Sequence, residues 1–275
     1  MHKIAVYGKG GIGKSTVSAN ISAGNALAGK RVLHVGCDPK RDSTLSLIVD
    51  KRPKTVAELL LLNRDRIFSV ESFLVHGKMG IDLVEAGGPE PGIGCAGRGI
   101  ARMFDTFEEF GLLSDDKYDL ALFDVLGDVV CGGFAAPLRR KYADLVVIVI
   151  SEEIMSLYAA NNICRAIVRF QKNGLRLAGM IVNRRDNSVF LQQVEDFASA
   201  INAKILATIP RDPLIRKAEM SGQTLMEFAP DSDTAKLFAD LSNKLFEMEN
   251  NTGTVPTPMD DDGFQEFISR YVDKD

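Results

Sequence analysis

One short string, Gly8-Lys9-Gly10-Gly11-Ile12-Gly13-Lys14-Ser15, constrains this chain more than any other feature of its sequence. It fits the phosphate-loop pattern G-x-x-x-x-G-K-S/T, and it lies between an apolar run at residues 3–7 and a helical pattern at residues 16–27. In that setting the glycines let backbone amides turn inward around a β-phosphate, Lys14 reaches the β- and γ-phosphates, and Ser15 holds Mg²⁺. The alternative is a glycine-rich turn that binds no nucleotide. The strand before the string and the helix after it favour the phosphate loop, called the P-loop below.

Short apolar runs recur between helical stretches along the whole chain. They occupy residues 3–7, 31–35, 81–84, 120–123, 145–150, 177–182 and 204–209. Because these runs are unbroken rather than alternating, they are typical of parallel strands that helices cover on both faces. The sequence therefore predicts an α/β fold of the P-loop NTPase type, with a doubly wound, mainly parallel sheet.

The expected domain organisation is one ATPase domain with a short tail. The 275 residues suit a single α/β domain, predicted over residues 1–250. Residues 250–258 are rich in Asn, Thr and Pro and indicate a linker. Residues 251–275 are accordingly predicted to form a linker and tail, in which an amphipathic piece at 263–272 packs on a neighbour.

Composition excludes several classes of protein. The net charge is −4, and no block of Lys and Arg stands out, so nucleic acid is not an expected partner. The chain runs from Met1 directly into an apolar strand pattern, and no apolar run approaches membrane-spanning length. A soluble, cytoplasmic protein without a membrane partner is expected.

Acidic residues follow two of the predicted strands, where ligands gather in a doubly wound sheet. Asp124 ends an apolar run, as in a Walker B motif that positions the hydration shell of Mg²⁺, and Asp128 lies where a γ-phosphate sensor would orient or deprotonate the attacking water. Asp38 and Asp42 follow the run at 31–35 and are candidates for a second switch. Asp42 precedes Ser43 and Thr44, and a plain helix cap is the alternative interpretation of this residue.

The four cysteines divide into two kinds. Cys95 and Cys131 are each surrounded by glycines, which let backbone amides approach a thiolate or sulfide closely. Neither has a C-x-x-C partner, which argues against a zinc site within one chain. Cys37 and Cys164 are interpreted as buried filler. Two good ligands per chain fit a cluster with four ligands if a symmetric dimer supplies the other two, with the cluster on the two-fold axis.

At this point the sequence resembles the nitrogenase iron protein family, which includes the ATP-dependent reductases of dark chlorophyll synthesis and related nitrogenase-like enzymes. The resemblance spans nearly the whole chain. It rests on YGKGGIGKST, GCDPKRDST, GGPEPGIGCAGRG, FDVLGDVVCGGFAAPL, YAANNI and IPRD.

The resemblance implies roles for individual positions. Cys95 and Cys131 match the ligands of a 4Fe-4S cluster, Arg98 matches an arginine at the surface that docks on the partner, and Lys9 matches the extra lysine of a deviant Walker A loop, which reaches the partner subunit's nucleotide. A solvated lysine is the alternative for Lys9. The catalytic residues implied are Asp128, Lys9 and Asp38. The positions implied to bind MgATP are Gly8, Lys9, Gly10, Gly11, Ile12, Gly13, Lys14, Ser15, Thr16, Asp38, Lys40, Asp42, Asp124, Asn183, Pro210, Arg211 and Asp212.

The function implied is that of an ATP-dependent electron-transfer component. It would be a homodimer that takes electrons from ferredoxin or flavodoxin and delivers them to a larger nitrogenase-like catalytic partner. Arg41 departs from the family, which carries alanine at this position in nitrogenase iron proteins and histidine in the chlorophyll-type reductases. The main alternative is a dimeric partitioning or positioning ATPase without redox chemistry, which explains the P-loop and Lys9 but not the two glycine-rich cysteines. A metabolite kinase would need an acceptor site for which the sequence offers no candidate.

Overall fold

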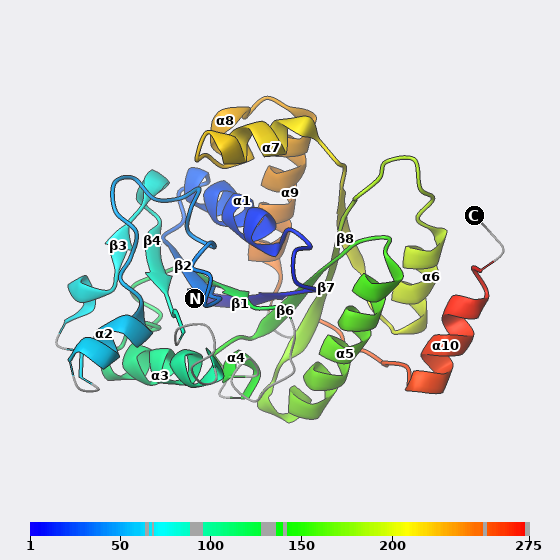
Figure 1. The fold of residues 1–275 in the computed structure, drawn as a ribbon, viewed down its shortest axis with the longest axis horizontal. Helices are drawn as coiled ribbons and strands as arrows, with labels where there is room; N and C mark the ends of the chain where they lie inside the picture. Colours follow the sequence, from blue (N-terminus) through cyan, green and yellow to red (C-terminus); the bar gives the residue numbers. More distant parts are fainter. Residues whose placement is uncertain are drawn as a thin grey trace.

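A computed structural model describes residues 1–63, 66–67, 69–88, 96–127, 136–139, 142–249 and 252–272 (Figure 1). Within these ranges the strands form one sheet in the order β3-β4-β2-β5-β1-β6-β7-β8. The strands are β1 (His2–Tyr7), β2 (Val32–Cys37), β3 (Val75–His76), β4 (Asp82–Glu85), β5 (Leu120–Val125), β6 (Leu145–Ile150), β7 (Arg176–Asn183) and β8 (Ile205–Ile209). Every neighbouring pair is parallel except β3 with β4.

Helices cover both faces of this sheet (Figure 1). One layer contains α1 (Lys14–Leu27), α7 (Pro213–Met220), α8 (Leu225–Phe228) and α9 (Asp233–Glu247). The other contains α2 (Val56–Leu62), α3 (Ala96–Glu109), α4 (Ala136–Arg139), α5 (Ile154–Phe170), α6 (Gln192–Ala200) and α10 (Asp261–Ser269). Short 3-10 turns η1 (Val70–Ser72), η2 (Lys78–Gly80) and η3 (Gln171–Asn173) complete the described elements.

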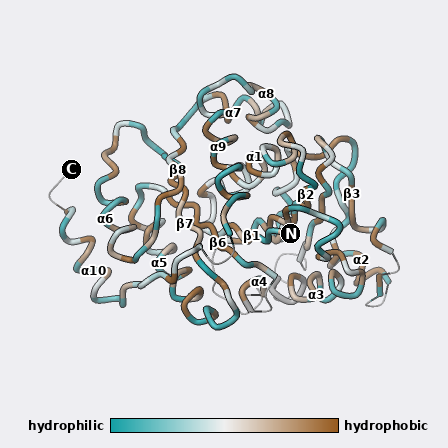
Figure 2. The backbone as a smooth tube through the Cα atoms, turned by 180° about the vertical axis from the view of Figure 1, so that it is seen from behind, coloured by the Kyte–Doolittle hydropathy of each residue, from teal (hydrophilic) through white to brown (hydrophobic). Residues whose placement is uncertain are grey.

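The core is split by the sheet into two apolar clusters. One packs α1, α8 and α9 against one face, with Phe238 fully buried, and the other packs α2 to α6 and α10 against the opposite face, with Phe104 fully buried. In Figure 2 the outer loops are mostly hydrophilic, and hydrophobic stretches gather in the central strands and in α9. Burial on both faces explains why the strands read as unbroken apolar runs.

The predicted fold class is confirmed, and all seven apolar runs correspond to parallel strands. The sequence did not reveal β3, which is two residues long and antiparallel to β4. Its pairing depends on the tight reversal at η2, and a two-residue strand is too short to show a period.

The tail segment stays against the main body of the chain. Thr254 pairs with Leu177 of β7 in an isolated antiparallel bridge, and the carbonyl of Met259 accepts hydrogen bonds from Asn161 and Arg165 of α5. Phe264 and Phe267 of α10 are buried in the core cluster. The boundary at residue 250 stays a prediction. None of the helices in the described ranges has the length and apolarity needed to cross a membrane.

Candidate nucleotide site

The P-loop connects the carboxyl end of β1 to the start of α1. β1 lies in the middle of the sheet, between β5 and β6, and ligands of doubly wound folds bind at the carboxyl ends of such central strands. Gly13 caps α1 in the left-handed region, with φ 96°, and a Cβ there would lie 2.4 Å from the amide nitrogen of Asn183. A Cβ on Gly127, after β5, would lie 2.5 Å from the backbone nitrogen of Gly10. Glycine is therefore favoured at position 13 by its positive φ, and at position 127 by the close approach of the P-loop backbone.

The start of α1 is electropositive. No side chain caps its first amides, its first turn holds no acidic residue, and Lys14 is 7% exposed. The Lys14 ammonium donates to the carbonyl of Lys9, with 3.2 Å between nitrogen and oxygen. Amides at a helix start and a sheltered cation together favour an anion, which fits a phosphate chain.

A cleft of about 720 Å³ opens at this helix start. It has the size of an ordinary small-molecule site. The predicted nucleotide residues that line it are Gly10, Gly11, Gly13, Lys14, Ser15, Thr16, Asp38, Lys40, Asp42, Asn183, Pro210, Arg211 and Asp212. Gly8, Lys9, Ile12 and Asp124 are not among its lining residues. The structure thus gathers most of the predicted set around one cleft, and their roles with nucleotide stay predictions.

Asp124 lies buried at the end of β5, with 2% of its surface exposed. Its Oδ2 accepts a hydrogen bond of 2.6 Å from the Ser43 hydroxyl, whereas Oδ1 is buried without a partner in the described part of the chain. Burial raises the pKa of this carboxyl, and hydrogen bonds from Ser15 and Ser43 and the charge of Lys14 act against that rise. An unpaired buried oxygen beside Ser15 suits the hydration shell of Mg²⁺.

A fully buried histidine extends this hydrogen-bond chain. His34 Nε2 lies 2.9 Å from Ser43 Oγ, and His34 Nδ1 lies 2.8 Å from Ser22 Oγ. Because Ser43 donates to Asp124, it accepts from Nε2–H, and Nδ1 accepts from Ser22. His34 is thus a neutral imidazole that joins α1 to the segment after β2, and burial lowers its pKa to about 4.

We expect His34 to make stability fall as the pH falls. Its folded pKa of about 4 is below the ordinary value of 6.5, so the unfolded chain binds more protons between these values. Between pH 7 and pH 5 this linkage costs about 2 kcal/mol. Urea unfolding at both pH values should show wild type losing about that much more stability than His34→Gln. An equal loss in both proteins would contradict the assignment.

Lys9 lies outside the cleft and forms an ion pair with Glu153, at 3.7 Å between Nζ and Oε2. Both side chains are about half exposed, so the pair contributes little and is easily exchanged for another partner. Two other predicted residues carry structural contacts. Asp212 caps α7 by accepting from Leu214 N at 2.8 Å, and Asn183 donates to Ile12 O at 2.8 Å.

The switch segment, defined as residues 38–44, begins with a turn in which Asp38 Oδ1 accepts from Lys40 N at 2.9 Å. Arg41 follows in the left-handed region with φ 59°. Its guanidinium donates to Pro53 O at 3.3 Å and lies 3.6 Å from the carboxylate of Glu58 in α2. Arg41 therefore ties the switch segment to α2, a contact that the sequence did not indicate.

Sequence reasoning missed the arginines after β7. Arg184 and Arg185 line the cleft, and the Arg185 guanidinium donates to the carbonyl of Gly11. Glu152, after β6, accepts from the backbone amides of Arg185 and Asp186 at 2.9 and 2.7 Å. Arg184, Arg185 and Glu152 each lie within two residues after a strand, and that position in the sequence could have indicated that they lie near the ligand site.

The predicted cluster ligands and the γ-phosphate sensor lie outside the described residues. This applies to Cys95, Cys131 and Asp128, and it applies to the side chain of Arg98, which belongs to α3. In the sequence Cys95 directly precedes the 14-residue helix α3, whose amino end favours an anionic thiolate. No group of three potential ligands occurs elsewhere in the described ranges.

The other two cysteines are buried, as predicted. Burial raises the pKa of the Cys37 thiol far above its ordinary value and that of Cys164 to about 12. Both thiols are therefore protonated and poor ligands.

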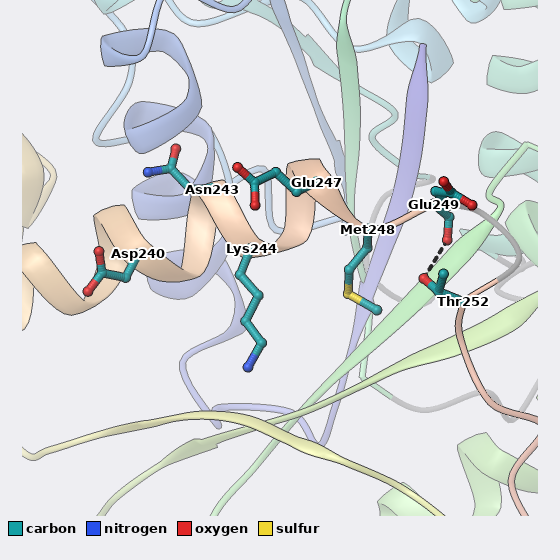
Figure 3. Close-up of a pocket in the computed structure, with 7 residues that line it drawn as sticks. All are labelled: Asp240, Asn243, Lys244, Glu247, Met248, Glu249 and Thr252. Carbon is teal, nitrogen blue, oxygen red and sulfur yellow. Dashed lines mark hydrogen bonds between the residues drawn. The ribbon is translucent and has the colours of Figure 1, made fainter.

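A second hollow, of about 530 Å³, lies along the end of α9 (Figure 3). It is lined by Asp240, Asn243, Lys244, Glu247, Met248, Glu249 and Thr252. The ring of Phe246 at this end of α9 lies 4.8 Å from that of His2, at the start of β1. The hollow therefore lies near the amino end of β1, whereas the P-loop follows its carboxyl end. None of the predicted site residues lines the hollow.

Comparison with known proteins agrees with these features. Residues 2–273 match the family model described as 4Fe-4S iron sulfur cluster binding proteins, NifH/frxC family. A nitrogenase iron protein of Methanospirillum hungatei is 44% identical over 99% of this chain and 96% of its own, and one of Methanococcus voltae is 43% identical over 97% and 95%.

Solved structures show the same fold in another class of ATPase. The septum site-determining protein MinD of Pyrococcus horikoshii, complexed with Mg-ADP, superimposes with a TM-score of 0.71 at 24% identity, over 90% of this chain and 97% of its own. That likeness shows the fold alone. The sequence match over nearly the full length shows that the chain belongs to the NifH/frxC family of 4Fe-4S iron–sulfur cluster binding proteins.

Proposed function

We propose that this protein is the ATP-dependent reductase component of a nitrogenase or nitrogenase-like system. It couples hydrolysis of MgATP to delivery of low-potential electrons, from a 4Fe-4S cluster shared by two subunits, to a larger catalytic partner. One observation carries the proposal: buried Asp124, which interacts with Ser15 and Lys14 of the P-loop, is only seven residues from Cys131 in the sequence. Movement at the nucleotide therefore has a short covalent path to a predicted ligand.

The residues of the cleft and the buried Asp124 have separate roles in binding MgATP. Lys14 and the amides at the start of α1 bind phosphate, Ser15 holds Mg²⁺, and Asp124 orients its hydration shell. Asp38 and Asp42 of the switch segment line the cleft where a γ-phosphate would be sensed. Asn183, Pro210 and Arg211 also line the cleft, and they are assigned as contacts to the base. When bound, MgATP supplies the phosphoanhydride that is cleaved and the cluster supplies the electron.

The functional unit is a homodimer, because each chain offers two cluster ligands, Cys95 and Cys131, and the cluster takes four. Its proposed location is the cytoplasm. Lys9 lies at the surface beside Glu153, free of the chain's own cleft lining, which suits a lysine that reaches the partner subunit's nucleotide. Arg98 is assigned to the surface that docks on the catalytic partner, and a ferredoxin or flavodoxin supplies electrons.

Asp128→Glu is expected to retain the cluster and uncouple ATP hydrolysis from electron delivery. The longer side chain keeps the charge but displaces the carboxylate that orients the attacking water. Phosphate release and electrons delivered are counted in the same assay with the catalytic partner. An unchanged ratio of ATP hydrolysed to electrons delivered would contradict the role given to Asp128.

The proposal is tested by isolating the protein without oxygen, with Mg²⁺, ADP and a γ-phosphate mimic added to hold the docked state. We expect a brown dimer with iron and acid-labile sulfide that retains a metalloprotein partner, identified by mass spectrometry. The MinD likeness makes a partitioning ATPase the competing function. A colourless ATPase that is dimeric and active without iron would establish that alternative.

A further inference from the structure

Two neighbouring hydroxyls of the switch segment each donate a hydrogen bond to a carboxyl group at the end of a different strand. Ser43 Oγ donates to Asp124 Oδ2 of β5 at 2.6 Å, and Thr44 Oγ1 donates to Glu85 Oε1 of β4 at 2.8 Å. The backbone nitrogen of Thr44 lies 3.2 Å from the same Glu85 oxygen. Both hydroxyl residues are 1% exposed, so these contacts are sheltered from water.

The carboxyl group of Glu85 is buried, and it lies where a side chain on Gly36 would otherwise be. Glu85 is 1% exposed, and it pairs in register with Gly36 of β2, where a Cβ would lie 2.1 Å from Glu85 Oε2. Burial raises the pKa of Glu85 to about 8, helped by the nearby charges of Asp124 and Asp42. A neutral carboxyl group here avoids repulsion with the buried Asp124.

Ala86, the residue that follows Glu85, is held by two backbone hydrogen bonds. Ala86 N donates to Gly36 O at 2.8 Å, and Ala86 O accepts from Ala57 N of α2 at 3.0 Å. Cys95 follows ten residues after Glu85, as Cys131 follows seven after Asp124. The two carboxyl groups bound by Ser43 and Thr44 thus belong to the residues that begin, in the sequence, the two segments with the predicted ligands.

We propose that Thr44 and Glu85 are positioning residues that transmit the nucleotide state from the switch segment to the segment ending at Cys95. Ser43 and Asp124 belong to the path to Cys131 that the proposed function already uses. This inference rests on the proposed function for its meaning, since it assigns each cysteine segment its own connection to the nucleotide. The contacts themselves are independent of whether a cluster binds.

The experiment is hydrogen exchange on the full-length dimer, prepared without oxygen, with MgADP or with Mg²⁺ and adenylyl imidodiphosphate. Three proteins are compared: wild type, Thr44→Val, which removes the hydroxyl at nearly constant shape, and Thr44→Ser, which keeps it. In wild type we expect exchange in residues 86–95 to differ between the two nucleotides by about fivefold, the factor that one ordinary hydrogen bond supplies. Thr44→Val should lose this difference but keep that in residues 125–131, and Thr44→Ser should retain both.

Nucleotide affinity, measured by titration calorimetry, should be the same in all three proteins within about twofold. A Thr44→Val protein that keeps the wild-type difference in residues 86–95, or a wild type that shows none, overturns the inference. If the expected pattern appears in preparations without iron or sulfide, the inference stands and the proposed redox function fails. The two failures are therefore distinguishable.

Discussion

Replacing Cys131 with alanine is expected to abolish binding of the iron–sulfur cluster. The variant chain keeps only one of the two predicted ligands, Cys95, so a symmetric dimer would offer two ligand thiolates in place of four. Two ligands hold a four-iron cluster far too weakly to survive isolation, and cluster content should fall below about a tenth of wild type. Iron, acid-labile sulfide and visible absorbance per dimer measure this directly.

Cys164→Ala is the matched control for the cysteine variant. Cys164 is buried in α5, and burial raises its thiol pKa to about 12, so removing it should leave the cluster content unchanged. Cys164→Ala should still bind MgATP, because Cys164 does not line the cleft. We expect Cys131→Ala to bind it as well, because the P-loop is unchanged in that variant. A Cys131→Ala dimer with wild-type iron and sulfide would show that the cluster uses other ligands or that no such cluster is bound.

Replacing Lys14 with alanine is expected to lower ATP hydrolysis by about 10²–10³-fold, the loss that follows removal of one preorganised charge or donor. Lys14 is the sheltered cation at the start of α1, and its ammonium already lies 3.2 Å from the Lys9 carbonyl. Its charge also opposes the rise in the pKa of Asp124, so Lys14→Ala should favour protonation of that buried carboxyl. Phosphate release at saturating MgATP measures the effect, with calorimetry to report nucleotide affinity.

Lys244→Ala provides a comparison for the lysine variant. Lys244 lies in α9 beside the hollow of Figure 3 and donates to Leu206 O at 3.1 Å. Lys244 does not line the nucleotide cleft, so removing its charge should leave the rate of ATP hydrolysis unchanged. Equal loss in the two variants, or a Lys14→Ala protein as active as wild type, would refute the P-loop assignment.

Local sequence was sufficient where a feature depends on neighbours along the chain. The P-loop string, the helix after it and the apolar runs are each set within about ten residues by backbone sterics and burial. The two-residue strand β3 was not predicted from the sequence, because it is defined by its pairing with β4 and is too short to show a period of its own. Cys37 is buried as predicted, and the structure adds that it is the last residue of β2, which extends beyond the run at 31–35.

Contacts between distant segments were not available from the sequence. Arg185 reaches Gly11 across 174 positions, and Ser43 reaches Asp124 across 81, because the carboxyl ends of the parallel strands β1, β2, β5 and β7 lie at the same end of the sheet. No periodicity specifies which parallel strands are neighbours, since each is equally apolar on both faces. Arg41, whose role the sequence left open, acquired a partner in Glu58 only through the packing of α2.

The sequence by itself determined the fold class, the phosphate loop, the candidate ligands Cys95 and Cys131 and the family. These rest on residue identity and spacing along the chain. The tertiary structure decided which polar groups meet in the interior, including the His34–Ser43–Asp124 chain and the contact of Thr44 with Glu85. The physical reason is that a buried polar group must find its partner in space, and the order of strands in the sheet sets which partner it finds.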